Sequence, residues 1–167
     1  MKRGIRIILR FIPAVFWMTA IYRFSAMSAV SSTYQSVSVT GRLVKYISRF
    51  ADIDAYTREQ LIVILEPYIR KTAHMCEYGL LFLLLVIPMG IIIRNEAVNI
   101  LFCGFISLLY SVTDEYHQTL VTGRSGEIRD IMIDMIGVLS AMLLYNVFIL
   151  AVSAVRVRRR KTKESKK

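Results

Sequence analysis

The sequence predicts an all-α integral membrane protein with four transmembrane helices, and three features support this fold class. The 167 residues are 55% hydrophobic, with a mean hydropathy of +0.50, which is more apolar surface than a soluble domain of this size can bury. Three long segments, 72–93, 97–113 and 131–155, carry almost no charge. At about 1.5 Å per residue each can cross about 30 Å of hydrocarbon, the second only just. Basic residues gather at both ends of the chain, as expected beside membrane spans.

The first crossing is the least regular of the four. Only 12 uncharged residues separate Arg10 from Arg23. A spanning helix must therefore run from about Ile7 to Ala26, with both arginines reaching toward opposite surfaces. The alternative is a helix that lies in the interface. The basic start resembles a signal peptide, but Arg10 and Pro13 interrupt the apolar run and no small-residue cleavage site clearly follows, so we expect a retained first helix.

A long connection separates the first two spans and predicts short interfacial helices. Its serine- and threonine-rich part, Ser28–Thr40, is typical of a loop. The next part, 41–50, places apolar residues on one face and basic residues elsewhere, which indicates a short helix. Thr57 fits the N-cap of a second short helix, Arg58–Glu66, which Pro67 should kink or end. We expect both short helices to lie on the membrane surface.

The charge distribution predicts the orientation. Thirteen of the 22 lysines and arginines fall on the side of the two termini if the chain spans four times, and eight of these lie in residues 156–167. Such a bias favours the cytoplasmic side for both termini. We therefore expect residues 1–155 to form the four-helix transmembrane domain, and residues 156–167 to form a basic cytoplasmic tail that anchors to anionic lipid.

Composition also argues against two other kinds of function. The net charge of +10 is not accompanied by any motif that reads nucleic acid, so nucleic acid is not an expected partner. Cys76 and Cys103 each fall in an apolar segment and lack the spacing of metal ligands. We expect both cysteines to be small buried residues.

The predicted topology gathers the unusual polar residues at one membrane face, the outer one. Charges inside a span are expensive and usually face a protein interior or a water-filled cavity. We therefore expect a shared pocket, with His74, Asp114 and Arg124 within about 10 Å of one another, just under two turns of helix rise. The residues on this face are Arg23, Ser25, Lys71, His74, Glu77, Tyr78, Asp114, Glu115, His117, Gln118, Arg124, Arg129, Asp130 and Asp134.

These residue types suit phosphate binding and proton transfer. Lys71, Arg124 and Arg129 could hold a phosphate. The candidate substrate-binding set is completed by Ser25, Tyr78, Gln118, Asp130 and Asp134. Candidate catalytic residues, for proton transfer or for holding Mg²⁺ with a phosphate, are His74, Asp114, Glu115 and His117. Each residue also has a purely structural interpretation, as an interfacial anchor, a helix-terminus charge or an ion-pair partner.

Three runs resemble motifs of the VanZ family. Residues 70–78 look like its Lys-x-x-His-x-x-x-Tyr helix start, and residues 114–126 resemble its Asp-Glu-x-x-Gln…Pro-Gly-Arg-x-Gly segment. The later residues Asp130, Asp134 and Gly137 are similar to its Asp-x-x-x-(Asn/Asp)-x-x-Gly pattern, and Ser25 fits its short serine motif. The resemblance covers the first to the fourth helix. One departure is Thr122, where the family pattern usually has proline, which changes loop stiffness more than chemistry.

The resemblance implies a multi-pass protein of the bacterial cell membrane, in a family named for a protein linked to low-level teicoplanin resistance. It implies no settled reaction, so whether the chain is an enzyme stays open. We expect binding of an anionic lipid or a lipid-linked cell-wall precursor at the outer face. One alternative is an enzyme acting on a phosphoester or pyrophosphate lipid. The other is a structural ion-pair network without a ligand, which a closed site with no cavity would favour.

Overall fold

The computed structural model describes residues 2–164, and within that range helices are the only regular secondary structure. They are α1 (Lys2–Leu9), α2 (Ile12–Ser25), α3 (Ala29–Ile47), α4 (Ala55–Met89), α5 (Glu96–Gln118) and α6 (Ile128–Glu164). Four stretches are long and apolar enough to cross a membrane, namely Gly4–Ser25, Ala55–Met89, Glu96–Gln118 and Ile128–Arg156. The predicted all-α fold with four spanning helices is therefore confirmed.

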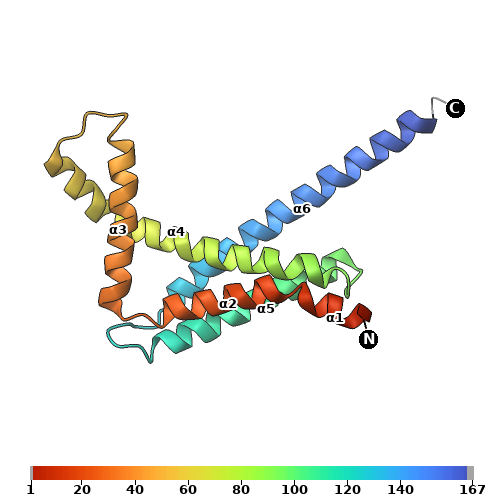
Figure 1. The fold of residues 1–167 in the computed structure, drawn as a ribbon, viewed down its shortest axis with the longest axis horizontal. Helices are drawn as coiled ribbons and strands as arrows, with labels where there is room; N and C mark the ends of the chain where they lie inside the picture. Colours follow the sequence, from red (N-terminus) through yellow and green to blue (C-terminus); the bar gives the residue numbers. More distant parts are fainter. Residues whose placement is uncertain (1, 165–167) are drawn as a thin grey trace.

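Helix α4 is the centre of the bundle. It packs against α2, α3, α5 and α6, and its longest contact is with α6. Helices α2 and α5 run alongside it, whereas α6 crosses it and then diverges (Figure 1). The buried core forms around Tyr78, Leu81 and Phe82 of α4, together with Ile21 of α2 and Cys103 of α5. Helix α3 lies across one end of the bundle, and both ends of the chain lie toward the other end (Figure 1).

The first span differs from the single helix expected over Ile7–Ala26. The structure divides it into α1 and α2, with a turn at residues 10 and 11. Pro13 explains the break, because it has no backbone N–H and its ring crowds the carbonyl four residues earlier. That carbonyl belongs to Leu9, the last residue of α1. The two helices still form a 22-residue apolar stretch, enough to span.

The loop predicted over Ser28–Thr40 is wrong, because this segment is the first part of α3. The side chain of Ser28 caps the helix by accepting from the backbone N–H of Ser31 at 3.4 Å. The Thr40 hydroxyl donates to the carbonyl of Ser36 at 2.9 Å, so the helix itself satisfies hydroxyls that often favour loops. Thr40 and Val44 are buried, and packing against α4 outweighs the weak helix propensity of the serines. The expected helix over 41–50 is the end of α3.

The short helix predicted over Arg58–Glu66 is also wrong in extent. It is the beginning of α4, a single helix of 35 residues. Asp54 rather than Thr57 is the N-cap, and its carboxylate accepts from the Thr57 backbone N–H at 2.8 Å. Pro67 does not end the helix, although the axis changes direction where it passes α3 (Figure 1). A helix of about 52 Å exceeds the hydrocarbon thickness of about 30 Å, so its first turns extend beyond it and pack on α3.

The remaining helices are longer than their predicted spans. Helix α5 continues past residue 113 to Gln118, so its last turn carries the polar residues 114–118. Helix α6 runs through residue 155 into the basic tail as far as Glu164, and residues 165–167 lie outside the described residues. Cys103 is buried as expected, but Cys76 is exposed on α4, so the prediction for Cys76 is wrong.

Helices α4 and α6 pack closely, backbone against backbone, at Gly137. A Cβ added there would collide with the backbone of Met75, at 2.6 Å from its Cα. Facing it, a Cβ on Gly79 would lie 3.0 Å from the Gly137 carbonyl oxygen. This backbone contact explains why His74 of α4 lies beside Asp134 of α6, one turn from the crossing.

Candidate functional site

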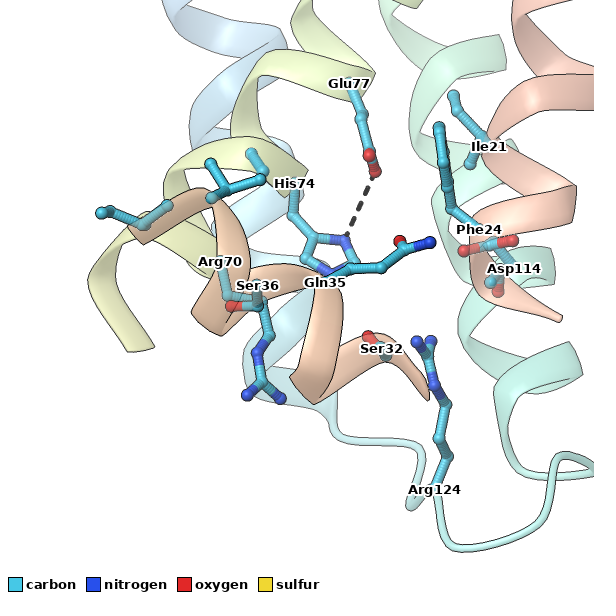
Figure 2. A pocket seen from close by; sticks show the side chains of 14 residues that line it. Ile21, Phe24, Ser32, Gln35, Ser36, Arg70, His74, Glu77, Asp114 and Arg124 are labelled. Atoms are coloured by element: carbon cyan, nitrogen blue, oxygen red, sulfur yellow. Dashed lines mark ion pairs between the residues drawn. The ribbon is translucent and has the colours of Figure 1, made fainter. Parts of the chain in front are cut away.

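A cavity of about 240 Å³ opens where α3 crosses the end of the bundle. Figure 2 shows Gln35 of α3, His74 and Glu77 of α4, Asp114 of α5 and Arg124 of the following loop gathered around it. Its lining is Ile21, Phe24, Ser25, Ser32, Gln35, Ser36, Val39, Ile69, Arg70, Ala73, His74, Glu77, Asp114 and Arg124. We call this the main cavity. Two further cavities, of about 250 and 190 Å³, adjoin it, and Arg70 and His74 line all three.

Asp114 and Arg124 are connected through an amide. The Asp114 carboxylate is buried and accepts from the Tyr78 hydroxyl at 2.9 Å and from the Gln118 side-chain N–H at 3.1 Å, both on Oδ2. The oxygen of the same Gln118 amide accepts from Arg124 at 2.9 Å. The side chain of Asp114 therefore fixes which way the amide points, and the amide positions the guanidinium. The predicted pair lies in one site, linked by Gln118.

The loop that carries Arg124 is held by backbone features. Gly123 has a φ of 78°, a left-handed conformation that favours glycine. Glu115 accepts from the backbone N–H of Glu127 at 2.6 Å, which ties the end of the loop to α5. A Cβ on Gly126 would lie 2.5 Å from the Thr119 methyl carbon, so glycine is needed there too. Glu115, a candidate catalytic residue, thus has a loop-holding contact and does not line the three cavities.

His74 lies between two carboxylates at the junction of the cavities. Its Nδ1 is 3.8 Å from Glu77 and 3.9 Å from Asp134, close enough for ion pairing but too far for a hydrogen bond. Asp134 is almost fully buried behind the ring and accepts from the Ser111 hydroxyl at 2.6 Å. Its other oxygen has no hydrogen-bond partner among the described residues. Asp134 therefore backs His74 instead of lining the cavity.

Arg70 and Arg124 both line the main cavity but differ in charge compensation. Arg70 forms an ion pair with Glu66, which also accepts from the Ser36 hydroxyl of α3 at 2.5 Å. Within the described residues, the Arg124 guanidinium has no carboxylate within 4 Å and donates its side-chain hydrogen bond to the neutral Gln118 amide. Burial lowers the pKa of the Arg124 guanidinium, an effect that the charge of Asp114 opposes. An arginine stays charged at neutral pH nonetheless, so Arg124 offers an available positive charge.

The other predicted residues are distributed around this centre. Lys71, Arg129 and Asp130 line the second cavity, and Gln118 and Asp130 line the third. Arg129 is exposed and pairs with Glu127 at 3.6 Å. Ser25 lines the main cavity, and its buried hydroxyl lacks a partner among the described residues. His117 stacks on Tyr22 of α2 with ring centroids 4.7 Å apart and does not line the three cavities.

Sequence reasoning missed the contribution of α3 and underrated Arg70. Ser32, Gln35, Ser36 and Val39 line the main cavity, but their segment was expected to be a loop. Their spacing of three to four residues places them on one face of a helix, and that periodicity was the available signal. Among the described residues, no three His, Cys, Asp or Glu side chains are grouped closely enough to hold a metal ion.

Comparison with known proteins gives one positive result. A family model described as VanZ/LLP1 matches residues 11–150. The matched range contains every residue that lines the three cavities. No curated protein and no solved structure matches the chain.

Proposed function

Because the chain belongs to the VanZ/LLP1 family, as its motifs predict, we propose that it binds the anionic headgroup of a membrane lipid, or of a lipid-linked cell-wall precursor, in the main cavity. The observation that carries the proposal is the two-sided lining of this cavity. One side is apolar, formed by Ile21, Phe24, Val39, Ile69 and Ala73, and the other is polar and charged. A concave site with an apolar wall and a few convergent polar groups suits an amphiphile.

Arg124 is the residue best suited to hold the anionic group. Its guanidinium is half-buried, so its charge is less screened than that of a surface arginine. It is held by a neutral amide, which orients the side chain without neutralising it. The planar fork of donors can contact two phosphate oxygens at once. Open space beside these groups also supports binding over a closed, purely structural network.

Replacing Arg124 with glutamine should weaken the binding of phosphatidic acid. A hydrogen bond to a charged group contributes about 1.5–3 kcal/mol, so we expect roughly a tenfold to hundredfold loss of affinity. The matched control is Arg49→Gln, which removes an exposed arginine that lines none of the three cavities and should stay near wild type. Native mass spectrometry of the purified protein with this lipid measures both. Equal affinities for wild type and Arg124→Gln would contradict the proposal.

The same measurement addresses the enzymatic alternative. The imidazole of His74, backed by the buried Asp134, has the arrangement of a proton-transfer group at a ligand site. If the bound lipid were converted, its mass would change with time in the wild type and stay constant in His74→Gln. An unchanged lipid mass in both proteins supports a binding function.

We place the site at the outer face of the bacterial cell membrane, with both termini in the cytoplasm. This orientation is supported by the basic residues near the two ends of the chain, which lie toward the bundle end opposite the site (Figure 1). In a Cys76→Ser background, Ser125→Cys should react with a membrane-impermeant thiol reagent in intact cells, whereas Thr162→Cys should not. Ser125 is exposed in the loop and avoids the strained Gly123. External labelling of Thr162→Cys would reverse the orientation.

A further inference from the structure

We infer that the headgroup in the main cavity is zwitterionic, a phosphate that also carries a primary amine, with Glu77 receiving the ammonium. This inference rests on the proposed function and adds the ligand class. It comes from the charged side chains that line the main cavity. Arg70 has a counter-charge and Asp114 accepts two hydrogen bonds, whereas Glu77 and Arg124 have neither a carboxylate–guanidinium ion pair nor two such bonds.

Besides His74, four acidic or basic side chains among the described residues line the main cavity: Arg70, Glu77, Asp114 and Arg124. Arg70 is neutralised by Glu66. The carboxylate of Asp114 accepts hydrogen bonds from a tyrosine hydroxyl and a glutamine amide. Arg124 and Glu77 remain, and the two are not within ion-pairing distance of each other. The protein therefore leaves one positive and one negative charge in the same cavity, each lacking a matched partner.

Glu77 has one charged neighbour within 4 Å among the described residues, the imidazole of His74 at 3.8 Å. That imidazole is shared, because Asp134 approaches the same nitrogen at 3.9 Å. Even a protonated His74 carries a single positive charge for two carboxylates. With both carboxylates ionised, negative charge remains beside the main cavity, inside a stretch long and apolar enough to span the membrane. An unpaired carboxylate is costly there, and a ligand ammonium group supplies the missing counter-charge.

The positions of Glu77 and Arg124 fit one ligand with two charges. Figure 2 shows Glu77 at one end of the main cavity and Arg124 toward the other, with His74 between them. Arg124 lies in the loop at the end of the bundle, whereas Glu77 lies further along α4. A purely anionic headgroup would satisfy Arg124 but be repelled by Glu77. A phosphate with an amine a short distance away satisfies both.

The lining favours a primary amine on a lipid. Quaternary ammonium groups are typically recognised by several Phe, Tyr or Trp rings, but among the described residues that line the main cavity only Phe24 is of these types. A primary ammonium instead donates hydrogen bonds, and the side chains of Glu77 and Gln35 offer oxygen acceptors in the same lining. The apolar wall formed by α2 and α3, including Ile21 and Val39, suits the glycerol and acyl part of a lipid. Phosphatidylethanolamine has this chemistry.

The test compares three lipids with identical acyl chains: phosphatidic acid, phosphatidylethanolamine and phosphatidylcholine. Wild type should bind phosphatidylethanolamine roughly tenfold more tightly than phosphatidylcholine, the effect expected of one charged hydrogen bond. Glu77→Gln should lose this preference and keep or increase its affinity for phosphatidic acid. Glu59→Gln makes the same chemical change on α4 at an exposed position outside the main cavity and should behave as wild type. The melting temperature of each variant checks folding.

Different outcomes separate this inference from the proposed function. If phosphatidic acid binding depends on Arg124 but wild type shows no preference for phosphatidylethanolamine, or Glu77→Gln keeps that preference, the zwitterion assignment is overturned and the proposed function stands. If no phosphate lipid binds in an Arg124-dependent way, both are overturned. Water-soluble phosphoethanolamine should compete poorly, because it cannot use the apolar wall; competition equal to that of the lipid would overturn the lipid assignment.

Discussion

Replacing Gly137 with alanine should strongly destabilise the protein. The added methyl group would meet the backbone of Met75, including its Cα at 2.6 Å, where real Cβ atoms are not found. Backbone atoms cannot rotate away as a flexible side chain can, so α4 and α6 must separate. Overpacking of a close contact costs about 1–3 kcal/mol, occasionally more, and small residues at helix crossings allow the close packing that holds membrane bundles together. We expect a large drop in melting temperature in detergent and a low yield.

Two other glycines provide a graded control. Gly79→Ala should cost less, because its Cβ would lie 3.0 Å from the Gly137 carbonyl oxygen and could be accommodated by a small shift. Gly4→Ala should be neutral or slightly stabilising, since nothing lies within 4 Å of its Cβ and alanine favours helix by about 1 kcal/mol. Melting temperatures that fall in any other order would show that the α4–α6 crossing does not limit stability.

The Gly137 crossing also shows where sequence reasoning stops. The spans followed from hydrophobic length, because about 20 apolar residues are needed to cross a bilayer. The pattern Asp130, Asp134 and Gly137 was visible on one helical face. The structural role of this pattern could not be predicted, because a helix that is apolar nearly all round does not reveal which of its faces packs against which neighbouring helix. In the structure, the missing side chain at Gly137 lets the backbone of α4 approach α6 closely. This close approach brings Asp134 of α6 near His74 of α4.

Helix α3 is an element whose secondary structure was predicted wrongly from the sequence. Its serines and threonines suggested a loop because local propensity was the only information used. The segment forms a helix since Thr40 and Val44 pack on α4 and Ser36 bonds Glu66, contacts between residues distant in sequence. The same helix forms one wall of the main cavity. The convergence of His74, Asp114 and Arg124 on one site was predicted from topology alone. The wall formed by α3 could be recognised only from the tertiary structure.

The combination of Asp114→Asn and Arg124→Gln should show strong coupling in lipid binding. Asp114 accepts from the Gln118 amide, and that amide accepts from Arg124. An asparagine can still accept from Tyr78 but presents an amide of its own, so the orientation of Gln118 is no longer fixed. We expect Asp114→Asn alone to weaken phosphatidic acid binding by roughly fivefold, about 1 kcal/mol. In the Arg124→Gln background the same change should have little further effect.

A double-mutant cycle measures this coupling. Residues in one hydrogen-bond network typically show coupling energies of 0.5–3 kcal/mol, and we expect about 1 kcal/mol here. The control cycle pairs Asp52→Asn, an exposed position before α4, with Arg124→Gln and should be additive. Because the Asp114→Asn change keeps the bond from Tyr78 and removes a buried charge, the melting temperature should stay near wild type or rise, as is common when polar groups of a functional site are replaced. Additive losses would mean that Asp114 contacts the ligand independently of Arg124. A fall in melting temperature that parallels the loss of binding would instead identify the Asp114–Gln118–Arg124 chain as part of the structural scaffold.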